Sequence, residues 1–327
     1  MVETKLDPIS TIARYHKVQP EKLRRSYKWK LSDFTQWEQK PHCEDYLIYP
    51  ENISEQLAID EVSLSKGELY TFITSKKYKT NQRKLVAVIN GTEAKTMIEV
   101  VNRISELKRN TVKEVSMDMA RNMELTIKTC FPNATRVTDR FHVSKLVIEA
   151  LQHMRVKYRW QAIDEENLAI KTAKGKNEKY IPAVLENGDT LKELLARSRY
   201  LLYKTPKDMT LNQAKRANLL FKQYPVLEQA YKLSLEFRAI YECPTKPIAT
   251  NTMDEWLEKV NKSEIKEFST VAKSINYHWD NILNFFDNRS TNANAESYNA
   301  KLKLFRANLR GVKDVKFFLF RLEKLFA

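Results

Sequence analysis

The chain has 327 residues and a formal net charge of +15, with 56 Lys and Arg against 41 Asp and Glu, which favours nucleic acid as a partner before an acidic membrane surface. Its five glycines nearly exclude a Rossmann or P-loop phosphate site, and its three isolated cysteines argue against a disulfide framework or a zinc ribbon and fit a reducing cytosol. No run approaches the roughly 18 apolar residues that span a bilayer, so we expect no transmembrane helix, no signal peptide and a cytoplasmic location.

Residues 9–40 predict two short helices around a turn near Lys17 to Gln19. Pro20 suits the first turn of the second helix, where its missing N–H costs nothing. One interpretation is a helix-turn-helix that docks on DNA through its basic residues. An ordinary basic helical hairpin with a solvated face would have the same pattern. The basic residues of interest are Arg24, Arg25 and Lys28. We place this helical region at residues 1–50, with a linker bracketed by Pro41 and Pro50.

From Leu57 the pattern changes to strands. The stretches LAIDEVSL, ELYTFIT and KLVAVIN are joined by short turns, which favours an antiparallel meander. A helix in EAKTMIEVVNRI, a strand in VKEVSMD, a helix in ARNMELTIKTCF and a strand in ATRVTD follow, and helical crossovers demand parallel pairing. This order is that of the mixed five-stranded sheet of the RNase H-like fold. We place its first part at residues 51–142 and its last part at residues 286–327.

Residues 143–285 look helical throughout, because leucine, tyrosine and alanine recur at helical spacing. Interruptions at GKNEKYIP and ENGDT separate the helices. The predicted fold class is therefore α/β, with an RNase H-like sheet interrupted by a large all-α insertion. Residues 286–327 predict a polar, cap-rich start followed by a basic amphipathic helix. Between Lys301 and Lys324 this helix holds eight basic residues against Asp314 and Glu323.

Asp60 and Asp118 lie on two strands that would be neighbours at the centre of this sheet. Adjacent strands are about 4.8 Å apart. That separation suits two carboxylates that share Mg²⁺ or Mn²⁺, since two such ions about 3.5–4 Å apart can hold the attacking and leaving oxygens of a phosphodiester displacement. Glu296, in STNANAESYN, is the candidate for a third carboxylate.

Each of these acids has a plainer interpretation when taken alone. Asp60 could be a satisfied buried acid, Asp118 a helix N-cap, and Glu296 an acid favoured by the helix dipole. The order of two strand aspartates, a long gap and a helix glutamate, beside a large positive charge, favours a catalytic site. Glu61 should point to the opposite face of its strand from Asp60 and is expected to be structural.

Two further groups of basic residues are candidates for DNA contacts. Trp160, with Arg155 and Lys157 nearby, could stack on a flipped base or a strand end, or it could lie in a core. Four basic residues that follow Glu296 are expected to line a DNA path, although a solvated helix face has the same composition. These four are Lys301, Lys303, Arg306 and Arg310.

Three stretches together resemble the DDE transposases of bacterial insertion sequences: LAIDEVSLSKGELY, VKEVSMDMARNMELTIKTCFPNATRVTDRFHVSKL and STNANAESYNAKLKLFRANLRGVKDVKFFLFRL. They are similar to the ISL-type group, distant kin of Mutator-like and hAT-like enzymes, over about residues 55–325, and FPNATRVTDRFHV is the most specific element. The resemblance implies an RNase H-like catalytic domain with an all-α insertion, and Mg²⁺-dependent cleavage and strand transfer at inverted repeats. By motif, Asp60, Asp118 and Glu296 match the three catalytic acids.

The resemblance also implies a C/D-x-x-H motif after the fifth strand, matched by Asp139 and His142. Asp139 would lie about 10 Å from the first strand, too far to share metals with Asp60, so this pair is expected to brace the site or the junction to the insertion.

Relatives often begin with a Cys-rich zinc module, which has no counterpart here. Either a separately encoded N-terminal DNA-binding polypeptide recognises the element ends, or the chain is a truncated copy. The resemblance implies a homo-oligomer on double-stranded DNA, both the element ends and the target, and a nucleoid-associated location in a bacterial cytoplasm. The alternatives are an inactive DNA-binding derivative and a solitary RNase H-like nuclease.

Overall fold

The computed structural model describes residues 2–65, 68–76, 84–289, 293–309, 312 and 314–327. The chain forms two units, one made of Met1–Asp139 and Asn288–Ala327 and the other of Arg140–Asp287. The second unit begins and ends within three residues of the predicted insertion. Within the described residues, every helix is too short or too polar to cross a bilayer.

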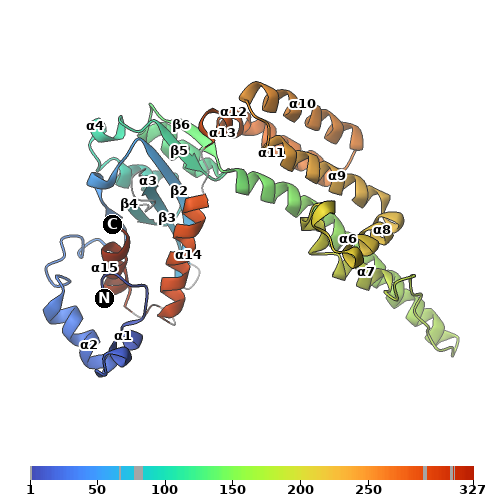
Figure 1. Ribbon diagram of the computed structural model, residues 1–327, viewed down its shortest axis with the longest axis horizontal. Helices are drawn as coiled ribbons and strands as arrows, with labels where there is room; N and C mark the ends of the chain where they lie inside the picture. The colour runs from blue at the N-terminus through green and yellow to red at the C-terminus, as the bar shows by residue number, and fades with distance from the viewer. Residues whose placement is uncertain (1, 66–67, 77–83, 290–292, 310–311, 313) are drawn as a thin grey trace. The chain divides into compact units, whose positions relative to one another are not determined.

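The first unit is built around a mixed six-stranded sheet in the order β1-β4-β3-β2-β5-β6 (Figure 1). Strands β2, β3 and β4 form an antiparallel meander, and β5 pairs in parallel with both β2 and β6. The five predicted strands and their RNase H-like order are confirmed. The strands are β1 Tyr46–Ile48, β2 Gln56–Ser65, β3 Glu68–Ser75, β4 Lys84–Asn90, β5 Glu114–Met117 and β6 Thr135–Thr138.

The predicted linker between Pro41 and Pro50 is wrong, because this stretch contains the sixth strand. β1 pairs antiparallel with β4, and Leu47 within it is fully buried. Pro50 opens a short 3-10 turn, η2 (Pro50–Asn52), in which Asn52 Nδ2 donates to Leu85 O at 2.8 Å. Proline is tolerated beside an edge strand, and the two prolines flank β1, with Pro41 in the turns before it and Pro50 in the 3-10 turn after it.

Helices cover both faces of this sheet. On one face, α3 (Ala94–Val101) and α5 (Arg121–Cys130) pack on Leu57 and Ile59 of β2, and the short α4 (Glu106–Arg109) lies between α3 and β5 in the chain. On the other face, α14 (Ala293–Asn308) and α15 (Val315–Phe326) pack on Val62 of β2 and on Phe72. Successive side chains of a strand point to opposite faces, which explains this division of β2 between two cores.

The predicted single basic helix at the C-terminal end is two helices. Asp314 caps the second of them, α15, by accepting a hydrogen bond from Phe317 N at 3.1 Å. Residues 317–322 of α15 are all buried, so this helix belongs to the core rather than to a DNA-facing surface. Lys301 and Lys303 of α14 are exposed, whereas Lys316 and Lys324 of α15 are partly buried and pair with Glu44 and Asp33.

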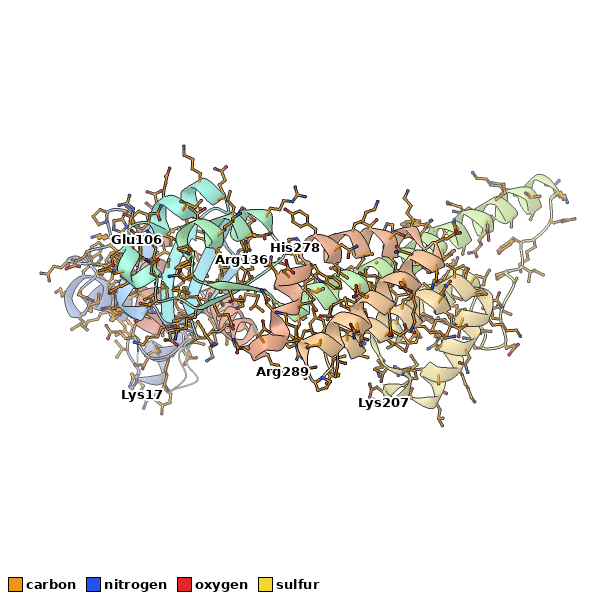
Figure 2. The ribbon with its side chains drawn as sticks, turned by 90° about the horizontal axis from the view of Figure 1, so that it is seen from above. Lys17, Glu106, Arg136, Lys207, His278 and Arg289 are labelled. Atoms are coloured by element: carbon orange, nitrogen blue, oxygen red, sulfur yellow. The ribbon has the colours of Figure 1, made fainter. Side chains whose placement is uncertain are left out.

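The N-terminal helices pack onto α15. α1 (Ile9–Tyr15) and α2 (Pro20–Ser26) flank the predicted turn at Lys17, labelled in Figure 2, and α2 continues as a π-helical turn, η1 (Tyr27–Leu31). The rings of Tyr27 and Phe34 lie 6.0 and 5.3 Å from that of Phe317, measured between centroids. The two helices and turn are confirmed, but they are part of the core of the first unit.

The second unit contains only helices and turns, in a range where every residue is described. Its longest helix, α6 (Arg140–Gly175), contacts α7, α9 and α11 (Figure 1). The predicted all-α insertion is thereby confirmed, with the break after Gly175. The remaining elements are α7 Leu191–Arg197, η3 Leu201–Tyr203, η4 Pro206–Asp208, α8 Leu211–Gln223, α9 Pro225–Ile240, α10 Lys246–Ser263, α11 Lys266–Tyr277, α12 Trp279–Leu283 and α13 Phe285–Asn288.

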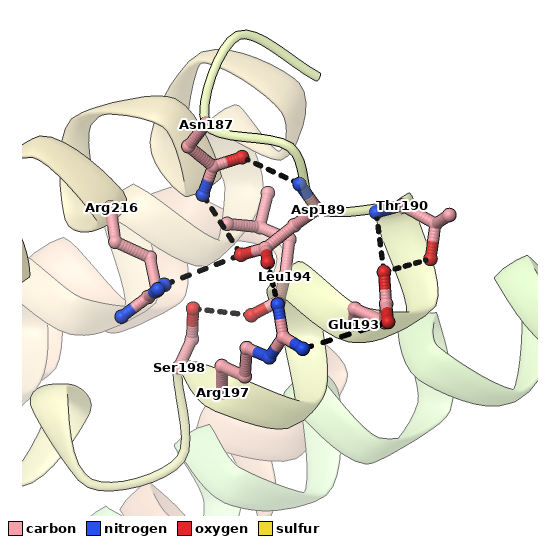
Figure 3. Close-up of polar contacts among 8 residues, drawn as sticks. All are labelled: Asn187, Asp189, Thr190, Glu193, Leu194, Arg197, Ser198 and Arg216. Carbon is pink, nitrogen blue, oxygen red and sulfur yellow. Dashed lines mark hydrogen bonds and ion pairs between the residues drawn. The ribbon is translucent and has the colours of Figure 1, made fainter. Parts of the chain in front are cut away.

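A buried carboxylate joins the segment after α6 to α7 and α8 (Figure 3). Asp189 is 1% exposed, and it accepts hydrogen bonds from Arg197 of α7, from Arg216 Nε of α8 at 3.4 Å and from Asn187 Nδ2 at 2.8 Å. A buried charge is tolerated only when it is paired in this way. Asp189 therefore fixes the start of α7 against α8.

An Asp189→Ala substitution is expected to lower the free energy of unfolding of the second unit by about 1–3 kcal/mol, because it removes these bonds while the half-exposed Arg197 can return to water. Urea denaturation measures the change. The matched control is Glu186→Ala, whose side chain is 82% exposed in the same segment and should change stability by less than about 0.5 kcal/mol. Equal effects of the two substitutions would contradict this role.

Candidate active site

Asp60 and Asp118 come from the central pair of parallel strands. The register of β2 and β5 pairs Ala58 with Ser116. Continued by two residues, it brings Asp60, within β2, level with Asp118, the residue that follows β5. Neighbouring strands are about 4.8 Å apart. The predicted neighbourhood of the two strands is confirmed, and their register brings the two aspartates to the same level of the sheet.

Asp60 lies on the face of the sheet that α14 covers. Ile59 of β2 belongs to the core with α3 and α5, so Asp60, the next residue of the strand, points the other way. Val62, two residues after Asp60, lies in the core with α14 and α15. This is the helix that contains Glu296, whose side chain lies outside the described part of the structure.

Local hydrogen bonds orient the two carboxylates. Asp60 Oδ1 accepts the backbone N–H of Glu61 at 2.8 Å, and Asp118 Oδ1 accepts that of Met119 at 2.5 Å. Asp118 follows the end of β5, and α5 begins three residues later at Arg121. Asp118 is therefore not the N-cap of α5, a position that Ala120 occupies. The alternative interpretation of Asp118 as a helix N-cap is therefore wrong.

Asp139 lies one strand further along the sheet. β5 and β6 pair Met117 with Thr138, so the next residues, Asp118 and Asp139, are also in register. Asp139 donates its backbone N–H to Met117 O at 2.8 Å and is 3% exposed. The three aspartates thus follow one another across three parallel strands, with Asp118 in the middle. His142 lies in the first turn of α6.

Glu61 lies on the opposite face from Asp60, as predicted, yet its charge is coupled to the pair. Burial raises the pKa of Glu61 above its ordinary value, the negative charges of Asp118 and Asp60 raise it further, and a side-chain hydrogen bond with Asn122 of α5 partly offsets this. Asn122 could not be singled out from the sequence, because an asparagine near the start of a helix can have many roles. Its side chain also donates to Thr92 O at 2.5 Å.

The sign of this shift predicts a pH dependence. Because the folded-state pKa of Glu61 is raised, the folded protein loses stability as the pH rises above the ordinary pKa of the carboxyl and through the folded-state value. Glu61→Gln is therefore expected to raise the free energy of unfolding at pH 7 in the absence of divalent metal, and to change it less at pH 4. Urea denaturation at both pH values tests this.

The control for this prediction is Glu106→Gln in α4, an exposed residue (Figure 2). It should change the free energy of unfolding by less than about 0.5 kcal/mol at either pH. A Glu61→Gln protein that is less stable than the wild type at pH 7 would contradict the predicted sign.

The donor atoms of Asp60 and Asp118 suit a hard divalent cation. Carboxylate oxygens are the ligands that Mg²⁺ and Mn²⁺ prefer, whereas zinc sites commonly use thiolates. Cys43 and Cys130 are buried, and burial raises the pKa of both thiols, that of Cys130 to about 11. Among the described side chains, which do not include that of Glu296, no group of three or more His, Cys, Asp and Glu could hold a metal. The described pair therefore fits Mg²⁺ or Mn²⁺ but needs a further ligand.

Residues 57–322 match the family model of the ISL3-type DDE transposases, described as a transposase family. The chain belongs to this family. Among curated relatives, it is 22% identical over 273 residues to the transposase for insertion sequence element IS1001 of Bordetella parapertussis, and 24% identical over 250 residues to that for IS1557 of Mycobacterium tuberculosis. These matches cover 83% and 76% of this chain.

The chain spans only about three fifths of the length of these relatives, since the matches cover 61% of the first and 55% of the second. A solved structure, the Drosophila P element transposase strand transfer complex, has 10% sequence identity and a TM-score of 0.34, with 95% of this chain and 93% of that chain covered. A likeness at this level supports no conclusion about the chain.

In the first unit of this ISL3-type chain, the residues that were predicted to bind DNA differ in their exposure and in the partners of their side chains. Arg24 and Arg25 of α2 are exposed. Lys28, in contrast, is not free to contact DNA, because its ammonium donates to Asp314 Oδ2 and lies 4.9 Å from the centre of the Phe34 ring. Arg306 of α14 donates to Ser63 O at 3.0 Å and so ties α14 to β2. Lys301 and Lys303 are exposed, and Arg310 lies outside the described residues.

In the second unit, one of the three predicted residues must be reassigned. Arg155 is 6% exposed, and its guanidinium donates to Gln152 Oε1 at 2.7 Å and to Leu195 O at 2.9 Å. It joins α6 to α7 and does not reach the surface, so its assignment to DNA was wrong. Lys157 is exposed beside Glu267 at 3.5 Å, and Trp160 is 60% exposed rather than part of a core.

Proposed function

We propose that this chain is the catalytic part of an insertion-sequence transposase, which cleaves DNA at the ends of its element and joins the freed 3′ ends to target DNA. The observation that carries the proposal is the register of β2 and β5, which brings Asp60 level with Asp118, with Asp60 on the face covered by the helix of Glu296. Membership of the transposase family supports it. The two-metal form of the reaction, with Glu296 as third acid, is part of the same proposal.

Asp60, Asp118 and Glu296 would hold Mg²⁺ or Mn²⁺, which when bound supplies charge stabilisation at the attacking and leaving oxygens of a phosphodiester. The chain itself would hold these carboxylates in position. Asp60 is fixed within β2, which is bonded on both sides, and Asp118 is held by the amide of Met119. Preorganised groups of this kind need no rearrangement during the reaction.

The chain would also hold the DNA. Lys301 and Lys303 are exposed on α14, the helix of Glu296, and would contact phosphates near the scissile bond. Lys157 and the exposed Trp160 would contact DNA from the second unit, with the indole stacking on a base. Asp139 and His142 would brace the junction between β6 and α6.

Because the relatives are longer, the remaining partners are also proposals. We propose that the chain acts as a homo-oligomer on double-stranded DNA, and that a separately encoded polypeptide adds recognition of the element ends. The basic α2, with the exposed Arg24 and Arg25, would give this chain a general contact with phosphates.

The test is cleavage by the purified chain of DNA that contains the inverted repeats flanking its reading frame. Nicks at the repeat boundary that require Mg²⁺ or Mn²⁺ and disappear with a chelator are the expected result. Binding without any cleavage, in either metal and with a partner polypeptide added, would instead support the inactive derivative. Nicking of all DNA without regard to the repeats would support a solitary nuclease.

A further inference from the structure

A cavity of about 370 Å³ lies within the first unit, between the N-terminal helices and the end of the chain. It is bounded by α1, α2, the end of α14 and α15. Its walls combine apolar side chains, such as Ile9 and Phe318, with the hydroxyls of Ser10 and Thr11. Three arginines and one aspartate also line it, namely Arg14, Arg24, Arg321 and Asp314. It is remote in sequence from Asp60 and Asp118, and the proposed reaction does not use it.

Arg321 is an unusual wall residue, because its charge is buried. It is 2% exposed, and Nη2 donates to the backbone oxygens of Val2 at 2.7 Å and Lys5 at 3.3 Å. Its Nε and Nη1 have no hydrogen-bond partner among the described residues. Burial lowers its pKa below the ordinary value, and the ring of Phe305 lies 4.9 Å from the guanidinium carbon.

The carboxylate of Asp314 does not neutralise this charge. It is bonded to Lys28 Nζ through Oδ2 and caps α15 through Oδ1. No ion pair to Arg321 occurs within the described part of the chain. The cavity therefore keeps a surplus of positive charge, with Arg14 and Arg24 exposed on its rim.

A buried, uncompensated guanidinium costs several kcal/mol, and an anion in the cavity would offset that cost. Arginine forks match the oxygens of phosphate, which can accept several charge-assisted hydrogen bonds at once. The volume exceeds what a lone phosphate needs and is in the range of small-ligand sites, so the group could enter with an attached sugar.

We propose that this cavity is a phosphate-binding site, in which Arg14, Arg24 and Arg321 hold a phosphate group. The group could belong to the backbone of a DNA strand that passes the N-terminal helices, or it could be a free phosphate or nucleotide. Only the first of these sources rests on the proposed function. The chemistry of the site is the same for both.

The first experiment is calorimetric titration of the full chain with inorganic phosphate at constant ionic strength. Saturable binding is expected, weakened at least about tenfold by Arg24→Ala and by Arg14→Ala, since each removes a charged donor. The matched control is Lys22→Ala, because Lys22 is another exposed cation of α2 and does not line the cavity. It should bind phosphate within about twofold of the wild type.

Arg321→Lys tests the buried residue, since a lysine keeps the charge but cannot replace the forked donors. A folded Arg321→Lys protein should bind phosphate at least about tenfold more weakly. If this protein does not fold, the Arg14 and Arg24 variants decide. Absence of saturable binding by the wild type, equal losses in Arg24→Ala and Lys22→Ala, or undiminished binding by folded Arg321→Lys would each overturn the proposal.

A second measurement distinguishes the sources. If the phosphate belongs to DNA, inorganic phosphate should displace a short duplex, and Arg24→Ala should weaken duplex binding more than Lys22→Ala. If it is free, phosphate and duplex should bind together. Neither measurement depends on cleavage. A chain that binds phosphate but never cuts DNA would therefore contradict the proposed function and leave the phosphate site supported. Acetate that binds as tightly as phosphate would show a carboxylate site and overturn the inference.

Discussion

An Asp118→Asn protein is expected to cleave end-containing DNA at least about 10³-fold more slowly than the wild type, while binding that DNA with similar affinity. The carboxylate stands in register with Asp60, where the loss of one charge would remove several kcal/mol of stabilisation from the displacement, and each 1.36 kcal/mol is tenfold in rate. Single-turnover cleavage and fluorescence anisotropy measure the two quantities.

Asp118→Cys separates a metal ligand from a merely structural acid. A thiolate binds Mg²⁺ poorly and accepts the softer Mn²⁺ more readily, so part of the activity should return in Mn²⁺ alone. Asp139→Asn is the comparison, since Asp139 is the next residue in the row and is assigned a bracing role. It should show no such change of metal preference. Full cleavage by Asp118→Asn would refute the assignment.

A Phe305→Ala substitution is expected to lower the free energy of unfolding of the first unit by about 3–5 kcal/mol. Phe305 is fully buried on α14, and its ring stacks on Phe318 of α15 with centroids 5.3 Å apart. Its removal leaves a cavity where α14 meets the sheet. Urea-dependent hydrogen exchange of the β2–β4 amides reports the stability of this unit.

Leu304→Ala is the control on the same helix, because Leu304 is 50% exposed and its truncation should cost less than about 1 kcal/mol. Since α14 also contains Glu296, Phe305→Ala is expected to slow cleavage under conditions where the protein remains folded. Similar costs for the two truncations would show that α14 is not anchored through Phe305.

Much of the fold follows from patterns that are local in sequence. Alternating apolar residues define β2 to β4, and the crossover helices dictate parallel pairing of β5 and β6, so the sheet order could be predicted. The three-residue β1 could not, because it is too short for a period of two to emerge. The break between α14 and α15 was missed because a basic composition suggested one exposed helix, whereas its phenylalanines at 317, 318 and 320 are core residues.

In the candidate site, the positions that follow from the order of the strands could be predicted from the sequence. Register placed Asp60 beside Asp118, and alternation placed Glu61 on the other face. Burial of individual arginines could not be predicted, because a guanidinium on a basic helix has the same sequence context whether it faces water or a backbone carbonyl. Arg155 and Arg321 are both of the second kind. Their partners, Leu195 and Val2, are far away in the chain.

The enclosure of α15 has a consequence for the order in which the protein can form. Its buried face packs against Tyr27 and Phe34 from the start of the chain as well as against the sheet. During synthesis on the ribosome, the core of the first unit therefore cannot be completed until α15 has been made. Residues 140–287, in contrast, can fold as soon as they have been synthesised. A nascent chain halted before residue 315 would expose the unpaired aromatic face of the N-terminal region, where chaperones would be expected to bind.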